Sequence, residues 1–187
     1  MALTLLDPNT ALIVVDLQKG LTGLPVIHPL GDIVGRARAL ADAFRERGLP
    51  VVLVNVAGGA PGRTEQPHKA LPRAEGWSDL VPELNRQAGD IVVTKRTWGA
   101  FASTDLAARL KALDVTQVVI AGVATGTGVE STARQAYEQG FNVTLAVDAM
   151  TDLRPEAHDH STRNVFPRLG ETGTSRQIID LLPPASA

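Results

Sequence analysis

Short apolar runs alternate along the chain with longer segments in which apolar residues recur every three or four positions. Each run is continuously apolar and rich in β-branched residues, as is typical of strands buried on both faces of a sheet. The runs are ALIVVD (11–16), VVLVNV (51–56), IVVTK (91–95), QVVIAGV (117–123) and VTLAV (143–147). They predict five strands of a parallel sheet.

The segments between these runs have helical periodicity and end at glycine or just before the next strand. The expected helices span residues 31–48, 104–113, 129–140 and 174–182. A further helix is expected after Pro155, and a short strand near Glu171–Thr172. The repeated strand–helix order favours a single domain, residues 1–187, with a parallel sheet covered by helices on both faces. In such sheets ligands bind beyond the carboxyl ends of the strands.

Residues 57–79 fit neither pattern. This segment is rich in glycine and proline and follows the second strand, on the side where ligands bind. Long irregular segments of compact domains are usually functional or disordered. We expect this loop to cover a pocket.

Glycines crowd the junction between the fourth strand and the next helix. The stretch Thr127-Gly-Val-Glu130 has the form of a capping box, so Thr127 is expected to cap the helix and Gly128 to take its first position. Amides at a helix N-terminus lack intrahelical acceptors and carry partial positive charge. The junction therefore predicts a place for an anion or an oxyanion, although glycines that merely permit a tight turn give the same pattern.

A dinucleotide site is an alternative interpretation of the same glycines. Gly126-x-Gly128-x-x-Ser131 follows a strand and opens a helix, and Asp148 ends the next strand. However, the third position is serine, and the motif follows the fourth strand rather than the first. This reading is the weaker one.

Charged residues end two of the predicted strands. Asp16 follows the first run and Lys95 closes the third, where a charge is costly unless it is paired. Because parallel strands share one carboxyl edge, both should meet the glycine junction there, although either alone could simply meet solvent. Burial would raise the pKa of Asp16 and Lys95 would lower it, so both an acid and a base role are open.

Composition narrows the classes of partner. The net charge is −2 and there is no cysteine, which excludes disulfides, thiolate metal sites and a thiol nucleophile. Nothing in the charge balance suggests a nucleic-acid or membrane partner, so we expect small molecules and copies of the same chain. The start MALTLLDPNT lacks a basic segment and a cleavage site, and we expect a cytoplasmic protein.

Histidines, aromatic residues and arginines supply weaker candidates. His28 and His68 are isolated, and His158 and His160 point to different faces of a helix, so no metal site is expected. Trp98 and Phe101 are three positions apart, so they could line a pocket from one helix face or pack in the core. The arginines that could bind a substrate carboxylate, or be simply solvated, are Arg63, Arg73 and Arg96.

Three stretches resemble a known family. ALIVVDLQKG, VTKRTWGAFASTDL and VVIAGVATGTGVESTARQAYEQGFNVTLAVDAMTD are similar, in order and spacing, to the signature regions of the isochorismatase-like hydrolases. That superfamily includes nicotinamidases and N-carbamoylsarcosine amidohydrolases. The similarity extends from about residue 10 to the RLGETGT near 168–174. It implies a three-layer α/β/α fold with a six-stranded parallel sheet in the order 3-2-1-4-5-6, and a homodimer or higher homo-oligomer.

The resemblance also implies site residues. The Asp, Lys and Cys of the cysteine-dependent members match Asp16, Lys95 and Gly128, so the nucleophile is missing. A cis peptide bond is implied at Val123-Ala124, with nearby amides forming an oxyanion hole. The metal-binding Asp-x-His of nicotinamidases reads NVAGGAPGR here, so neither a metal nor another cofactor is expected.

Isochorismatases proper also carry glycine at the position of the cysteine. Their aspartate is thought to protonate a vinyl ether, after which water attacks, and Gly128 would leave room for substrate or water. However, the turn GVATGTG is closer to the amidohydrolase form GVAT. The resemblance therefore does not single out isochorismate as the substrate.

We predict a metal-free, cysteine-independent hydrolase that acts on a small, carboxylate-bearing molecule. Asp16 is the general acid or base, Lys95 orients it, and amides at Gly128 bind negative charge or water. The residues assigned to substrate contact are Gln18, Trp98, Phe101, Ala124, Thr125 and Thr127. The alternatives are a non-catalytic binding protein of the same fold, and an amidohydrolase inactivated by a Cys→Gly change.

Overall fold

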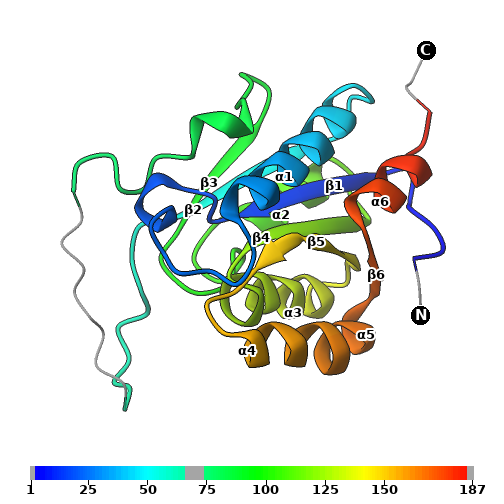
Figure 1. Ribbon diagram of the computed structural model, residues 1–187. Coiled ribbons are helices and arrows are strands. Elements are labelled where there is room, and N and C mark those ends of the chain that lie inside the picture. The colour runs from blue at the N-terminus through cyan, green and yellow to red at the C-terminus, as the bar shows by residue number, and fades with distance from the viewer. Residues whose placement is uncertain (1–2, 66–73, 185–187) are drawn as a thin grey trace.

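The computed structural model describes residues 3–65 and 74–184 of the chain. Six parallel strands form one sheet in the order β3-β2-β1-β4-β5-β6 (Figure 1), which confirms the predicted fold class and strand order. The strands are Thr10–Val15 (β1), Val51–Val56 (β2), Ile91–Lys95 (β3), Gln117–Val123 (β4), Asn142–Thr151 (β5) and Glu171–Gly173 (β6).

Helices cover both faces of the sheet (Figure 1). One face carries α1 (Leu30–Arg45) and α6 (Ser175–Leu181). The other carries α2 (Leu106–Ala112), α3 (Glu130–Glu138), α4 (Pro155–His160) and α5 (Phe166–Leu169). Shorter helical turns are η1 (Lys19–Leu21), η2 (Pro82–Leu84), η3 (Thr125–Val129) and η4 (Ser161–Val165).

Strand β1 shows why the predicted runs are apolar throughout. Leu12 and Val14 pack in the cluster beneath α1, whereas Ile13 and Val15 pack in the cluster beneath α2 and α3. Because successive side chains point to opposite faces, a central strand covered on both sides has no polar face.

Two parts of the fold differ from the prediction. Strand β5 continues past the expected end at Val147, because the polar residues of its second half find partners: Asp148 accepts from the amide and hydroxyl of Ser175, and Thr151 accepts from the amide of His28. The helix expected after Pro155 runs on through η4 into α5.

Strands β1 and β4 approach closely at Gly122. A Cβ on Gly122 would lie 2.0 Å from the carbonyl oxygen of Val15, and the residue has a φ of +117°. Only glycine combines that conformation with that approach. The register of β4 against β5 also shifts between Ile120 and Gly122.

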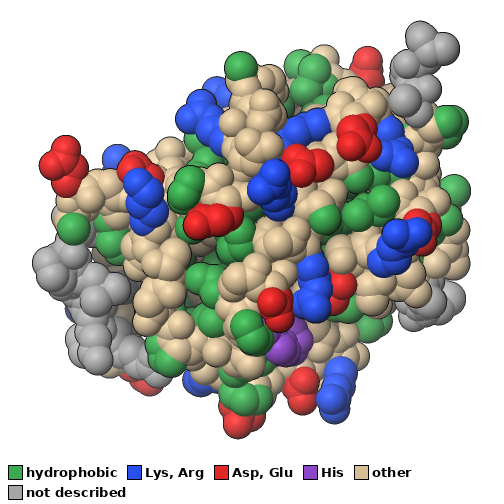
Figure 2. Space-filling model, turned by 45° about the horizontal axis from the view of Figure 1, so that its top comes forward, with side chains coloured by type: hydrophobic (Ala, Val, Ile, Leu, Met, Phe, Trp, Pro, Cys, Tyr) green, Lys and Arg blue, Asp and Glu red, His purple; other side chains and the backbone are tan. Residues whose placement is uncertain are grey.

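The surface shown in Figure 2 carries basic and acidic side chains side by side, with no large area of one sign. Within the described part of the chain, no helix has the length and apolar character needed to span a membrane. The middle of the 57–79 segment, with His68 and Arg73, lies outside the described residues.

Candidate active site

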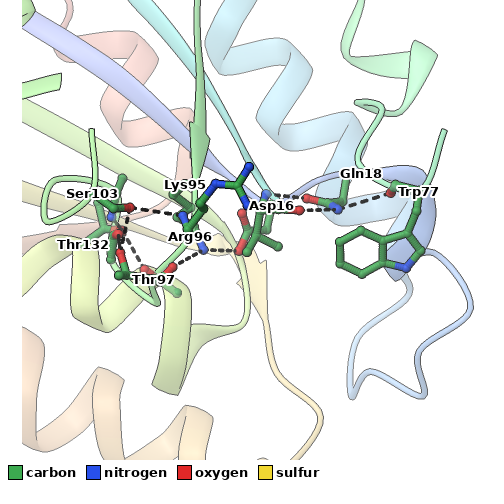
Figure 3. A network of polar contacts seen from close by, with 12 residues as sticks. Asp16, Gln18, Trp77, Lys95, Arg96, Thr97, Ser103 and Thr132 are labelled. Carbon is green, nitrogen blue, oxygen red and sulfur yellow. Dashed lines mark hydrogen bonds and ion pairs between the residues drawn. The ribbon is translucent and has the colours of Figure 1, made fainter. Parts of the chain in front are cut away.

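A buried ion pair lies at the carboxyl edge of the sheet. Asp16 follows β1, Lys95 ends β3, and their Oδ2 and Nζ atoms are 2.7 Å apart. The two residues are only 5% and 2% exposed. The Lys95 ammonium also donates to the carbonyl oxygen of Thr97 at 3.2 Å, so it lies between the Asp16 carboxylate and the loop after β3 (Figure 3).

The second carboxylate oxygen of Asp16 has a different environment. Oδ1 is buried and accepts no hydrogen bond from any described residue. Burial raises the pKa of Asp16 from 3.8 to about 6, although the charge and the hydrogen bond of Lys95 act in the opposite direction. A buried acceptor without a partner is costly, so Oδ1 is suited to receive a proton or an O–H donor.

Gly128 lies directly against this pair. A Cβ built on it would be 3.2 Å from Asp16 Oδ2, 3.1 Å from Val15 Cγ1 and 3.0 Å from the carbonyl oxygen of Val123. The carboxylate, the ammonium and the glycine junction therefore meet at one point. On its Cβ side, however, Gly128 leaves less room than we expected, because those three contacts are tighter than a methyl group normally makes.

The predicted capping box at Thr127 is wrong. The helical turn η3 already begins at Thr125, so Gly128 lies inside the turn, and neither η3 nor α3 has a side-chain cap from within its own segment. The amides of Thr127 and Val129 both donate to the carbonyl oxygen of Ala124, at 3.0 and 3.1 Å. The carboxylate of Glu130 binds Arg134 and Ser161 instead.

Asp152 binds the start of the turn in place of Thr127. Its Oδ2 accepts from the amide of Gly126 at 2.7 Å, and its Oδ1 accepts from the amides of Leu153 and Arg154. Asp152 follows β5 and is buried. The sequence analysis missed this residue, and the signal that could have found it was a carboxylate just beyond the end of a buried strand.

The backbone before the turn has the geometry that the resemblance implied. The peptide bond between Val123 and Ala124 is cis. Ala124 is the residue that precedes η3, and it is partly buried.

Two of the residues assigned to substrate contact have structural contacts. The buried Gln18 amide donates to the carbonyl oxygens of Val56 and Trp77 and accepts from the Val56 amide, which ties the end of β1 to that of β2. Phe101 is buried in the core and lies 5.9 Å from Phe141, ring centre to ring centre. Trp98, by contrast, is 64% exposed.

Comparison with known proteins gives the family. The family model described as the isochorismatase domain matches residues 10–177. The chain belongs to the isochorismatase family. It is 38% identical over 179 residues to the uncharacterized isochorismatase family protein YwoC of Bacillus subtilis (strain 168), covering 92% of this chain and 93% of YwoC.

A solved structure and a named enzyme are also similar to this isochorismatase-family protein. The structure of an isochorismatase family protein from Burkholderia thailandensis superposes with a TM-score of 0.91 at 38% identity, covering 95% of this chain and 97% of that one. The ureidoacrylate amidohydrolase RutB of Variovorax paradoxus (strain S110) is 30% identical over 212 residues, covering 96% of this chain and 83% of RutB. The family thus includes hydrolases.

Two histidines that the sequence analysis did not relate to each other, His28 and His158, lie in contact beside the turn of this isochorismatase-family site. The rings of His28 and His158 are 5.0 Å apart and edge-on. The buried Thr125 Oγ1 is 2.9 Å from His158 Nδ1, and Thr151 Oγ1 is 3.2 Å from His28 Nδ1. Burial, and then the neighbouring His28, lower the pKa of His158. The Thr125 hydroxyl therefore has a histidine as its partner.

Two weaker interpretations of the sequence concern a metal ion and a dinucleotide. Across residues 3–65 and 74–184, no three or more histidine, aspartate or glutamate side chains are grouped to hold a metal ion. Asp148, which the dinucleotide reading would assign to a ribose, binds Ser175 at the start of α6. Arg96 has its amide held by Ser103 Oγ at 3.1 Å, and its side chain is exposed at the carboxyl edge of the sheet.

Proposed function

We propose that this isochorismatase-family protein is a hydrolase in which Asp16, and not a cysteine, transfers the proton of an attacking water. One observation carries the proposal: the buried Asp16–Lys95 pair lies against Gly128, and Asp16 Oδ1 accepts no hydrogen bond from the described residues. The similarity to RutB, which is named an amidohydrolase, supports hydrolysis as the reaction class.

In this mechanism a water donates its proton to Asp16 Oδ1 while its oxygen forms a bond to the electrophilic carbon of the substrate. The bond to the leaving nitrogen or oxygen then breaks, and the leaving group takes the proton back from Asp16. A pKa of about 6 supports the base role, because the carboxylate is ionised at neutral pH yet remains basic enough to accept a proton. Lys95 holds Oδ2, so the reaction uses Oδ1.

The remaining assigned residues complete this proposal. Trp98, Ala124, Thr125 and Thr127 lie in or beside the segments that border the ion pair, and with Gln18 and Phe101 they stay predicted substrate contacts. The exposed Arg96, adjacent to Lys95, supports a small substrate that bears a carboxylate. Action as a homodimer or higher homo-oligomer also remains a prediction.

A pH–rate profile tests the role of Asp16. Isochorismate, ureidoacrylate, nicotinamide and simple amides form the substrate panel, and kcat/KM should rise with pH through about 6 because the ionised carboxylate is the base. Asp16→Asn should lower it by roughly 10²- to 10⁴-fold. Asp180→Asn, which changes an exposed carboxylate paired with Arg176 in α6, should leave it unchanged.

The outcomes separate the alternatives. Full activity in Asp16→Asn would remove Asp16 from the mechanism. Activity that falls through the same pH range would assign Asp16 as the acid. A ligand that raises the melting temperature, without turnover of any member of the panel, would favour the non-catalytic binding protein.

A further inference from the structure

The buried hydroxyl of Thr132 lies between the two sides of the candidate site. Thr132 belongs to α3 and has no exposed surface. Its Oγ1 donates to the carbonyl oxygen of Gly128 at 2.6 Å and accepts from the amide of Ala100 at 3.1 Å (Figure 3). One hydroxyl thus serves as donor to the turn and acceptor for the loop after β3.

On the turn side, this hydroxyl fixes the orientation of Gly128. The peptide unit between Gly128 and Val129 is held at both ends: its carbonyl accepts from Thr132 and its N–H donates to the carbonyl oxygen of Ala124. Gly128 is the residue whose Cβ position faces Asp16 Oδ2. A change at Thr132 is therefore expected to move Gly128, which lies beside the Asp16 carboxylate.

On the loop side, the same hydroxyl holds the segment that positions Lys95. The Lys95 ammonium donates to the Thr97 carbonyl, and Thr97 Oγ1 donates to the carbonyl oxygen of Gly99. The next residue, Ala100, binds Thr132, and Phe101 donates its amide to Gln135 Oε1 at 3.0 Å. Two side chains of α3 therefore dock this loop.

A threonine hydroxyl that binds the carbonyl four residues earlier is common in helices. The second bond, to Ala100 in a different element, makes Thr132 a link rather than a local contact. We infer that Thr132 is a positioning residue for the proposed hydrolysis, whose hydroxyl sets where the Lys95 ammonium and Gly128 stand relative to Asp16. This inference rests on the proposed function, but its main test needs no substrate.

The test is a ¹³C NMR titration of the Asp16 carboxyl carbon. Thr132→Val keeps the shape of the side chain and removes the hydroxyl. The Lys95 ammonium should then lie less close to Asp16 on average. Because that ammonium lowers the pKa of Asp16, the pKa should rise above that of the unmodified protein. Thr132→Ser keeps the hydroxyl and should restore the original titration. If valine prevents folding, Thr132→Ala removes the same two hydrogen bonds.

Two control variants distinguish a specific displacement of Lys95 and Gly128 from a general loss of packing. Thr144 is also fully buried, and its hydroxyl accepts from Gln117 Nε2 at 3.1 Å at the opposite edge of the sheet, so Thr144→Val should leave the Asp16 titration unchanged. Gln135→Ala removes the loop bond at Phe101 without touching Gly128, and its effect should be smaller than that of Thr132→Val.

An unchanged titration in Thr132→Val, or an equal shift in Gln135→Ala, would overturn the inference. With a substrate from the panel, Thr132→Val should lower kcat on the order of 10- to 100-fold with little change in KM, as expected for misplacement of reacting groups. If the titration shifts as expected but no substrate is turned over, Thr132 still positions the pair and the proposed hydrolysis is the part that fails.

Discussion

At the scale of single residues, Gly128 distinguishes this site from a cysteine-bearing one. A Cβ at this position would be crowded by Val15, Asp16 and the Val123 carbonyl. A cysteine simply lost from an otherwise unchanged site would leave a gap there. The three close contacts therefore favour glycine over a larger residue at this position.

Gly128→Ala should therefore destabilise the protein. The added methyl meets a backbone carbonyl at 3.0 Å, which cannot rotate away as a flexible side chain would. Overpacking of this kind costs about 1–3 kcal/mol in the free energy of unfolding, measured by urea denaturation. A Cβ on Gly59 meets nothing within 4 Å, so Gly59→Ala is the control, and an equal small change in both variants would contradict the crowding.

At the scale of elements, the turn η3 depends on a residue from another strand. Its start is held by Asp152, which follows β5, and its side packs on α4, where Thr125 meets His158. The local Thr-x-x-Glu pattern predicted a self-contained cap and was wrong, because the helical turn begins at Thr125. Here a carboxylate from after β5 binds an amide at the start of the turn, which no local pattern could indicate.

Asp152→Ala should weaken this turn. It leaves the amides of Gly126, Leu153 and Arg154 without their carboxylate acceptor, and each loss of a buried acceptor costs roughly 1–3 kcal/mol. The urea midpoint should fall accordingly. Asp180→Ala removes an exposed ion pair with Arg176 in α6 and should change stability by about 0.5 kcal/mol or less. If both variants had the same midpoint, Asp152 would not be the residue that holds the turn.

At the scale of the whole molecule, most of the sheet was predictable and the way the site closes was not. Continuous apolar runs mark β1, β2 and β4, because a strand buried on both faces must be apolar. The strand order came from the resemblance, since hydrophobic periodicity carries no information on which strands are neighbours. The Asp16–Lys95 pair followed from shared strand direction. The contact between His28 and His158 joins distant segments that no local pattern relates.

The titration of Asp16 should be visible in the stability of the whole protein. Its pKa is about 6 in the folded state against 3.8 for an ordinary aspartate, so its contribution is fully present below pH 3.8 and is lost as pH rises through about 6. Between pH 4 and pH 7, the free energy of unfolding should fall by roughly 2 kcal/mol more in the unmodified protein than in Asp16→Asn.

That comparison cancels the other carboxylates. Glu171, for example, acts with the opposite sign, because hydrogen bonds from Thr4 lower its pKa, but it is the same in both proteins. Urea denaturation at several pH values measures the difference between the two free energies. A difference that stays constant with pH would show that burial does not hold a proton on Asp16.

The strand order also bears on how the nascent chain acquires this chemistry. The strand synthesised first, β1, ends up in the middle of the sheet, between β2 and β4. Asp16 emerges from the ribosome long before Lys95 and Gly128, and until β3 and β4 have joined the sheet it is an ordinary solvated carboxylate. A half-made or half-folded chain therefore lacks the buried Asp16–Lys95 pair, so the proton transfer that we propose requires β3 and β4 to be in place.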